Sequence, residues 1–142
     1  MWVPYQIIGH GSGPIYGPLV EFEIIAPLQD PFPTKGLVDS GADSSLLDIA
    51  IADELNLPVR KVPGKIAQAA GGILFAVHVF PIQARFGGIT FELDARWAAL
   101  ADDEEVRGFN LLGRGDFFQA FKVLFDQQRE GIEITPYRKK KY

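Results

Sequence analysis

The most informative residues of this 142-residue chain stand in one short run: Leu37-Val38-Asp39-Ser40-Gly41-Ala42-Asp43-Ser44-Ser45. The apolar residues that open the run predict the end of a strand, and a carboxylate, a hydroxyl and a glycine follow at once. A carboxylate in this place is held by a rigid strand yet stays near the surface, and Gly41 lets another backbone approach closely. A general acid or base needs such exact placement, so Asp39 is the candidate catalytic residue.

Two segments together resemble a known family. Residues 37–42 are similar to the active-site motif of the retroviral-type aspartic proteases (retropepsins): two apolar residues, Asp, Thr or Ser, Gly and Ala. Leu111-Leu112-Gly113-Arg114 is similar to the family's second motif, two apolar residues followed by Gly-Arg, which precedes a C-terminal helix. The motifs occur in the family's order with a Gly-Gly pair between them, and the resemblance covers residues 17–135.

This resemblance implies a mostly β, closed barrel-like acid-protease fold with one or two short helices. It also implies an endopeptidase that works as a homodimer on extended polypeptides, without a metal or other cofactor. Catalysis of this kind needs two carboxylates that share one proton around a water, because like charges so close together cannot both be ionised. The chain has a single Asp-Ser-Gly motif, so the second copy of Asp39 must come from a second subunit across a twofold axis.

The resemblance also implies roles for the residues near Asp39. Ser40 would hydrogen-bond across the dimer axis, while Gly41 and Ala42 would support the active-site loop. A flap that closes over the peptide would contain Ala69, Ala70, Gly71, Gly72 and Ile73. Leu112, Gly113 and Arg114 would be structural and would pack behind the active-site loop.

Alternation of apolar and polar residues predicts strands over residues 19–26, 75–80 and 89–96. The glycine pairs at 71–72 and 87–88 predict tight turns, because glycine tolerates a positive φ. The two prolines of residues 30–33 predict a loop there.

Two helices are also expected. Leu47, Ile51 and Leu55 recur at helical spacing, which predicts a helix that ends before Pro58 and has Asp43 as its cap. A second, short helix is expected over residues 116–121, followed by a hairpin of residues 121–125 and 132–134. The strand–turn–helix pattern thus follows both motifs, which suggests a faint internal repeat.

The ends of the chain differ from the middle in composition. Residues 1–16 are expected to be a flexible N-terminal extension, and residues 136–142 a basic tail. Thr135-Pro136-Tyr137 does not read as a strand, which leaves the contacts of a dimer at the termini open. The acidic run at 102–105 is expected to be a solvated connection.

Composition excludes several other classes of protein. Hydrophobic residues make up 47% of the chain and charged residues 23%, as in an ordinary globular domain. A net charge of −4 argues against a general nucleic-acid partner, and no apolar stretch approaches the roughly 18 residues of a membrane helix. With two histidines and no cysteine, a metal centre or thiol nucleophile is not expected, and the cytoplasm is the default location.

Two blander interpretations remain open on the sequence alone. Asp39 could be an ordinary turn residue, since Asp and Gly are common in turns. Alternatively, the chain could be a catalytically inactive retropepsin-like module that serves in dimerisation or peptide binding, because a fold does not dictate a function.

Overall fold

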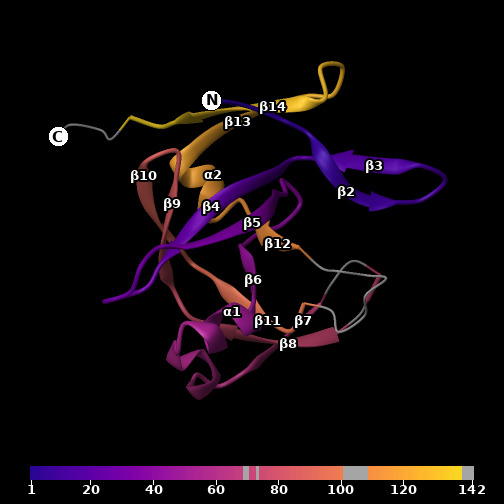
Figure 1. The fold of residues 1–142 in the computed structure, drawn as a ribbon. Helices are drawn as coiled ribbons and strands as arrows, with labels where there is room; N and C mark the ends of the chain where they lie inside the picture. The colour runs from indigo at the N-terminus through magenta and orange to yellow at the C-terminus, as the bar shows by residue number, and fades with distance from the viewer. Residues whose placement is uncertain (69–70, 73, 101–108, 139–142) are drawn as a thin grey trace.

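The chain folds mainly into short strands, as its 15 glycines and 10 prolines suggest. The computed structural model describes residues 1–68, 71–72, 74–100 and 109–138 (Figure 1). Two short α-helices, α1 (Ile49–Glu54) and α2 (Phe117–Ala120), and a 3-10 helix, η1 (Pro58–Lys61), accompany the strands. The strands, in chain order, are β1 (Trp2–Pro4), β2 (Gln6–His10), β3 (Pro14–Gly17), β4 (Leu19–Ile25), β5 (Phe32–Val38), β6 (Leu46–Asp48), β7 (Lys65–Gln68), β8 (Leu74–Val79), β9 (Ile82–Phe86), β10 (Ile89–Leu93), β11 (Arg96–Ala98), β12 (Asn110–Leu112), β13 (Phe121–Asp126) and β14 (Gly131–Pro136).

One large sheet carries both sequence motifs. Its strand order is β10-β9-β4-β5-β12-β6-β11-β8-β7, and β5 and β12 are parallel neighbours at its centre. Leu37 lies opposite Leu111 and Val38 opposite Leu112, so the two motifs leave the sheet side by side. The faint repeat of the sequence therefore corresponds to two adjacent parallel strands.

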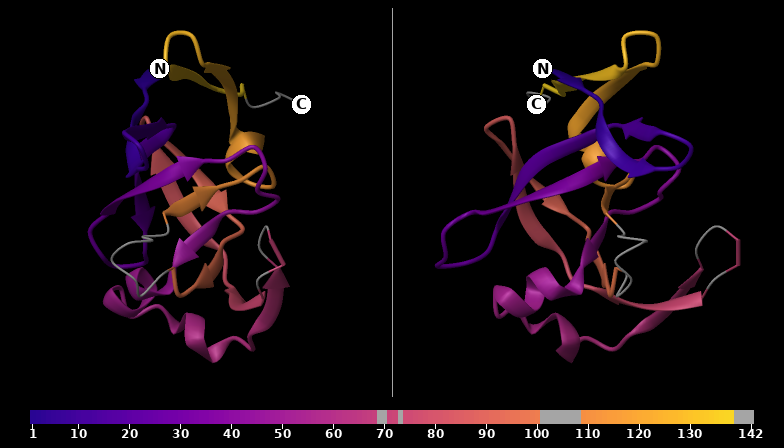
Figure 2. Two further views of the ribbon diagram at one scale, coloured as in Figure 1. Left: turned by 90° about the vertical axis from the view of Figure 1, so that its right-hand side faces the viewer. Right: turned by 45° about the vertical axis from the view of Figure 1, so that its right-hand side comes forward.

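The expected mostly β fold with two short helices is confirmed, but the sheet is not a closed barrel. Among the described residues, no pairing joins the end strands β10 and β7. The reason lies in β8, which pairs with β11 only at His78 and Val79. The rest of β8 pairs with β7 in a hairpin that projects from the body (Figures 1 and 2). This hairpin forms one end of the sheet and does not pair with β10 at the other end.

Most of the predicted strands and turns are present. The alternating segments form β4, β8 and β10, although the predicted strand over 89–96 is divided between β10 and β11. The glycine pair 71–72 joins β7 to β8 and the pair 87–88 joins β9 to β10, and all four glycines have a positive φ. The second helix and the β13–β14 hairpin are confirmed, and α2 has Asp116 as its N-cap. The predicted loop at 30–33 is wrong in part, because β5 begins at Phe32. Pro33 pairs with Glu23 of β4 on one side, and β12 pairs with β5 only from Gly36 on, so the missing N–H of the proline breaks no pairing on the other side.

Helix α1 begins later than the spacing predicts. Residues 46–48 form β6, which pairs with β11 on one side and with β12 on the other. This pairing satisfies backbone groups on both edges of the segment while Leu47 stays fully buried, so the strand is favoured over an extra turn of helix. The expected cap at Asp43 is therefore wrong: the Asp48 carboxylate accepts the Ala50 N–H at 3.1 Å.

The N-terminal segment is not the flexible lead-in that its composition predicts. Strand β1 pairs with β14, and β2 pairs with β3. The Trp2 ring lies so close over Gly131 that a Cβ there would approach it to 2.2 Å, and the Arg129 guanidinium lies 4.2 Å from the ring centre. The expectation that Thr135 and Pro136 lie outside a strand is also wrong, because both belong to β14 and pair there with Lys122 and Phe121 of β13. Pro136 stands at the strand end, where its missing N–H costs little.

Aromatic rings fill the core between the large sheet and α2. The fully buried Phe117 ring lies 5.8 Å from Phe86, 5.8 Å from Phe91 and 4.9 Å from Phe121, measured between ring centres. The contacts with Phe86 and Phe91 are edge-to-face, an arrangement that aromatic pairs prefer.

No helix in the described ranges is long and apolar enough to cross a membrane.

Replacing Phe117 by alanine tests this packing. Phe117→Ala is expected to lower the free energy of unfolding by about 3–5 kcal/mol, because it leaves a cavity among three rings. Phe125→Ala, on a ring that is 41% exposed, is the matched control and is expected to cost far less. Urea denaturation of both variants measures the difference, and equal losses would contradict the described core.

Candidate active site

Asp39 follows β5 directly, and the backbone around it fixes its side chain. The Asp39 N–H donates to the carbonyl of Leu112 at 3.0 Å, which anchors the residue to the end of β12. The Asp39 Oδ1 accepts the Gly41 N–H at 2.8 Å, and the Asp39 carbonyl accepts the Ala42 N–H at 3.2 Å. The carboxylate is half-buried, whereas Ser40 is exposed beside it. These bonds set the direction of the carboxylate without burying it.

A cavity of about 400 Å³ opens beside Asp39. Its size lies within the range of ligand-binding clefts. One part of its lining follows Asp39 in sequence or pairs with that segment: Gly41, Ala42, Asp43, Ser44, Ser45, Leu46 and Leu111. The other part comes from β7, β8 and β11: Ala67, Gln68, Phe75, Val77 and Arg96. The β7–β8 hairpin therefore borders the same cavity as Asp39.

Only part of the expected flap lies within the described residues. Gly71 and Gly72 stand at the turn between β7 and β8, with φ values of +86° and +82°. The other three expected flap residues, Ala69, Ala70 and Ile73, lie outside the described residues.

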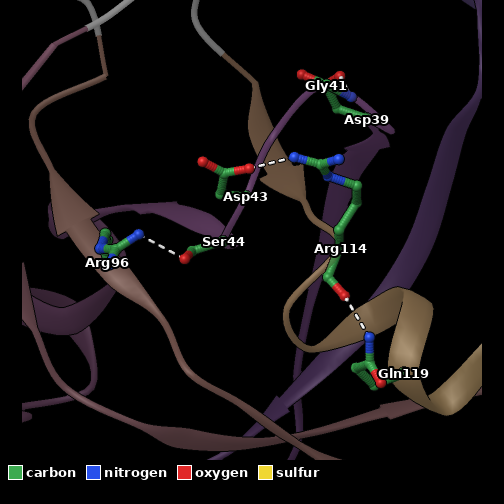
Figure 3. Close-up of polar contacts among 7 residues, drawn as sticks. All are labelled: Asp39, Gly41, Asp43, Ser44, Arg96, Arg114 and Gln119. Atoms are coloured by element: carbon green, nitrogen blue, oxygen red, sulfur yellow. Dashed lines mark hydrogen bonds and ion pairs between the residues drawn. The ribbon is translucent and has the colours of Figure 1, made fainter.

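The second motif packs against the first. The Arg114 N–H donates to the Ala42 carbonyl at 2.9 Å, and the Gly115 N–H donates to the Asp43 carbonyl at 2.8 Å. The Arg114 guanidinium forms an ion pair with the Asp43 carboxylate (Figure 3). A Cβ on Gly113 would lie 2.6 Å from the carbonyl carbon of Ser44 and 2.7 Å from its oxygen, so only glycine allows this approach.

A buried pair that sequence reasoning missed lies behind these contacts. The Ser45 hydroxyl donates to the Asp116 carboxylate at 2.5 Å and accepts the Gly113 N–H at 3.0 Å. The Asp116 carboxylate also accepts the N–H groups of Phe117 at 2.6 Å and Asp94 at 3.1 Å. Asp116 ahead of two phenylalanines is a detectable cap signal, but nothing local in the sequence pairs it with Ser45.

Arg96 is the second feature of the site that the sequence did not indicate. It begins β11, and its Nη1 donates to the Ser44 hydroxyl (Figure 3). The alternation of residues 89–96 places Arg96 on a polar face but gives no sign that this face borders Asp39. In the described parts of the chain, no group of three or more His, Cys, Asp or Glu side chains could hold a metal ion.

Comparison with solved structures identifies the fold. The chain is similar to a retropepsin-like aspartic protease from Rickettsia conorii, with a TM-score of 0.58 and 17% sequence identity over 95% of this chain and 98% of that one. The chain has the retropepsin fold. The fold that the two motifs predicted is thereby confirmed, apart from closure of the sheet.

Other solved structures with this fold are also similar to the chain. EIAV protease in complex with the inhibitor HBY-793 has 25% identity and a TM-score of 0.48, over 69% of this chain and 82% of that one. The retroviral protease-like domain of Ddi1 from Leishmania major has 14% identity and a TM-score of 0.45, over 84% and 95%. No protein-family model matches the chain, and no curated protein does.

The close approach at Gly113 gives a test of how this site is built. Gly113→Ala is expected to lower the free energy of unfolding by about 1–3 kcal/mol, because the added methyl meets backbone atoms that cannot turn aside. Gly9→Ala, where a Cβ would meet nothing within 4 Å, is the matched control. If thermal or urea unfolding shows that both variants are equally stable, the packing of the two motifs described above is wrong.

Proposed function

We propose that the protein is an aspartic endopeptidase that hydrolyses peptide bonds in extended polypeptides, as a homodimer with one Asp39 from each subunit. The observation that carries this proposal is the position of Asp39. Its half-buried carboxylate is held by the Gly41 N–H at the end of a central strand and faces a cavity large enough for substrate side chains. The retropepsin fold supports the same function.

The proposed reaction uses the two carboxylates as one unit. One ionised Asp39 takes a proton from a bound water, whose oxygen attacks the carbonyl carbon of the scissile bond. The partner's Asp39, which holds the shared proton, donates it to the carbonyl oxygen. As the C–N bond breaks, the first Asp39 gives the proton it took from water to the departing amine, and a hydroxyl of the gem-diol intermediate gives its proton to the partner's Asp39. The products are a carboxylic acid and an amine, and the pair is left with one proton again.

The residues around Asp39 have supporting roles in this proposal. Exposed Ser40 hydrogen-bonds across the dimer axis, and Gly41 holds the carboxylate through its N–H and accepts a hydrogen bond from the substrate. Ala42 supports the active-site loop through its bond to the Asp39 carbonyl. Leu112, Gly113 and Arg114 fix the active-site loop from behind, through the contacts with Asp39, Ser45, Ala42 and Asp43 described above. In this proposal the β7–β8 hairpin, with Gly71 and Gly72 at its turn, is the flap that covers a bound peptide.

Replacing Asp39 by asparagine tests the reaction. Asp39→Asn is expected to lower cleavage of an unfolded protein by at least about a hundredfold, because the amide cannot accept the proton from water. Asp30→Asn, which changes an exposed carboxylate in the loop between β4 and β5, is the matched control and should leave cleavage unchanged. A pepstatin-type inhibitor should block the wild-type protein. Cleavage that persists in folded Asp39→Asn protein would overturn the assignment.

Mixing the two proteins tests whether the site is shared. An excess of Asp39→Asn protein, allowed to exchange subunits, is expected to suppress wild-type cleavage, because mixed dimers hold only one working carboxylate. The assay uses saturating substrate, so that the variant cannot lower the cleavage rate by sequestering the substrate. An equal amount of an unrelated folded protein is the control. Unchanged wild-type activity, despite proven exchange, would show that one chain is sufficient.

A further inference from the structure

The geometry of β11 points to a recognition site for acidic side chains beside Asp39. Trp97 is fully buried, and its Nε1 donates to the Phe80 carbonyl at 2.8 Å in the core. Because neighbouring residues of a strand point to opposite faces, Arg96 is directed away from that core and into the Asp39 cavity. The backbone of Arg96 is held between β6 and β8, and its N–H donates to the Ser45 carbonyl at 3.0 Å.

Among the described residues, the charges around the cavity leave Arg96 as the cation without a carboxylate partner. The Asp43 carboxylate is already paired with Arg114 on the other side of the loop (Figure 3). Of the ion pairs in the described part of the chain, none includes Arg96, and the hydrogen-bond acceptor of its guanidinium there is the neutral Ser44 hydroxyl. One hydroxyl uses one of the five N–H donors of a guanidinium, so the others can bind a ligand.

The surroundings strengthen an interaction with a carboxylate. Arg96 is half-buried, and Leu46, Phe75, Val77 and Leu111 provide apolar lining around it. Charged hydrogen bonds are stronger where water is partly excluded, and guanidinium binds carboxylate through two parallel bonds. Leu46, Val77 and Leu111 would contact the methylene groups of a glutamate, whose carboxylate would reach Arg96.

We propose that Arg96 is a specificity-determining residue that selects substrates with a glutamate or aspartate a few residues from the scissile bond. Figure 3 places Asp39 and Arg96 at opposite ends of the 39–44 segment, so the recognised side chain is not one that flanks the bond being cut. This inference rests on the proposed function, because it describes a substrate of the Asp39 site.

Peptide cleavage tests the proposal. The substrates are variants of one apolar peptide with blocked ends. At each position in turn, one variant carries Glu and its counterpart carries Gln, so the Glu side chain is the only carboxylate in the peptide. The wild-type protein is expected to cleave the Glu peptide with a kcat/KM about tenfold higher at one position, as a charged hydrogen bond allows. Arg96→Gln should abolish this preference, Arg96→Glu should reverse it, and Arg96→Lys should keep part of it. Arg60→Gln is the matched control and should keep the full preference. It removes a guanidinium on η1 that is already paired with Asp53 of α1.

A binding experiment separates failure of this inference from failure of the proposed reaction. Asp39→Asn protein should bind the preferred Glu peptide about tenfold more tightly than its Gln counterpart by calorimetry, and Asp39→Asn/Arg96→Lys should retain part of the difference. Absence of cleavage together with this binding preference would overturn the protease assignment but support Arg96. Equal cleavage and equal binding of Glu and Gln peptides at every position would overturn the role of Arg96, whatever the activity of Asp39.

Discussion

The site depends on a buried chain of hydrogen bonds from the Gly113 N–H through the Ser45 hydroxyl to the Asp116 carboxylate. Ser45 is fully buried and Asp116 nearly so, so each of these groups would be costly to leave without a partner. These hydrogen bonds connect the loop after β5, the turn after β12 and the start of α2. The position of Asp39 therefore depends on Gly113 and Asp116, which are distant from it in sequence, and on Ser45, which connects them.

This network explains why the two motifs must lie side by side. The parallel pairing of β5 and β12 brings Asp39 next to Leu112, and the absence of a side chain at Gly113 lets the two loops touch. The ion pair of Arg114 with Asp43 then closes the far side of the loop. Precision at a carboxylate that stays half-exposed thus comes from backbone pairing and close packing behind it.

The sequence predicted those features that depend on neighbours along the chain. Asp39 after an apolar strand, the Gly-Arg motif and the turns at the glycine pairs all carry local signals. Residues 46–48 were expected to be helical because Leu47 fits either period, and only pairing with β11 and β12 decides between them. The N-terminal strands and Arg96 were missed for the same reason, since their partners lie far away in the sequence.

The alternation along β11 has a consequence for how the protein can change. Trp97 belongs to the core and its neighbour Arg96 to the cavity, although one peptide bond joins them. The strand therefore separates the residue that packs in the core from the one that lines the cavity. Exchanges at position 96 can accumulate without repacking the interior, so related chains can diverge in what they recognise while they retain the same architecture.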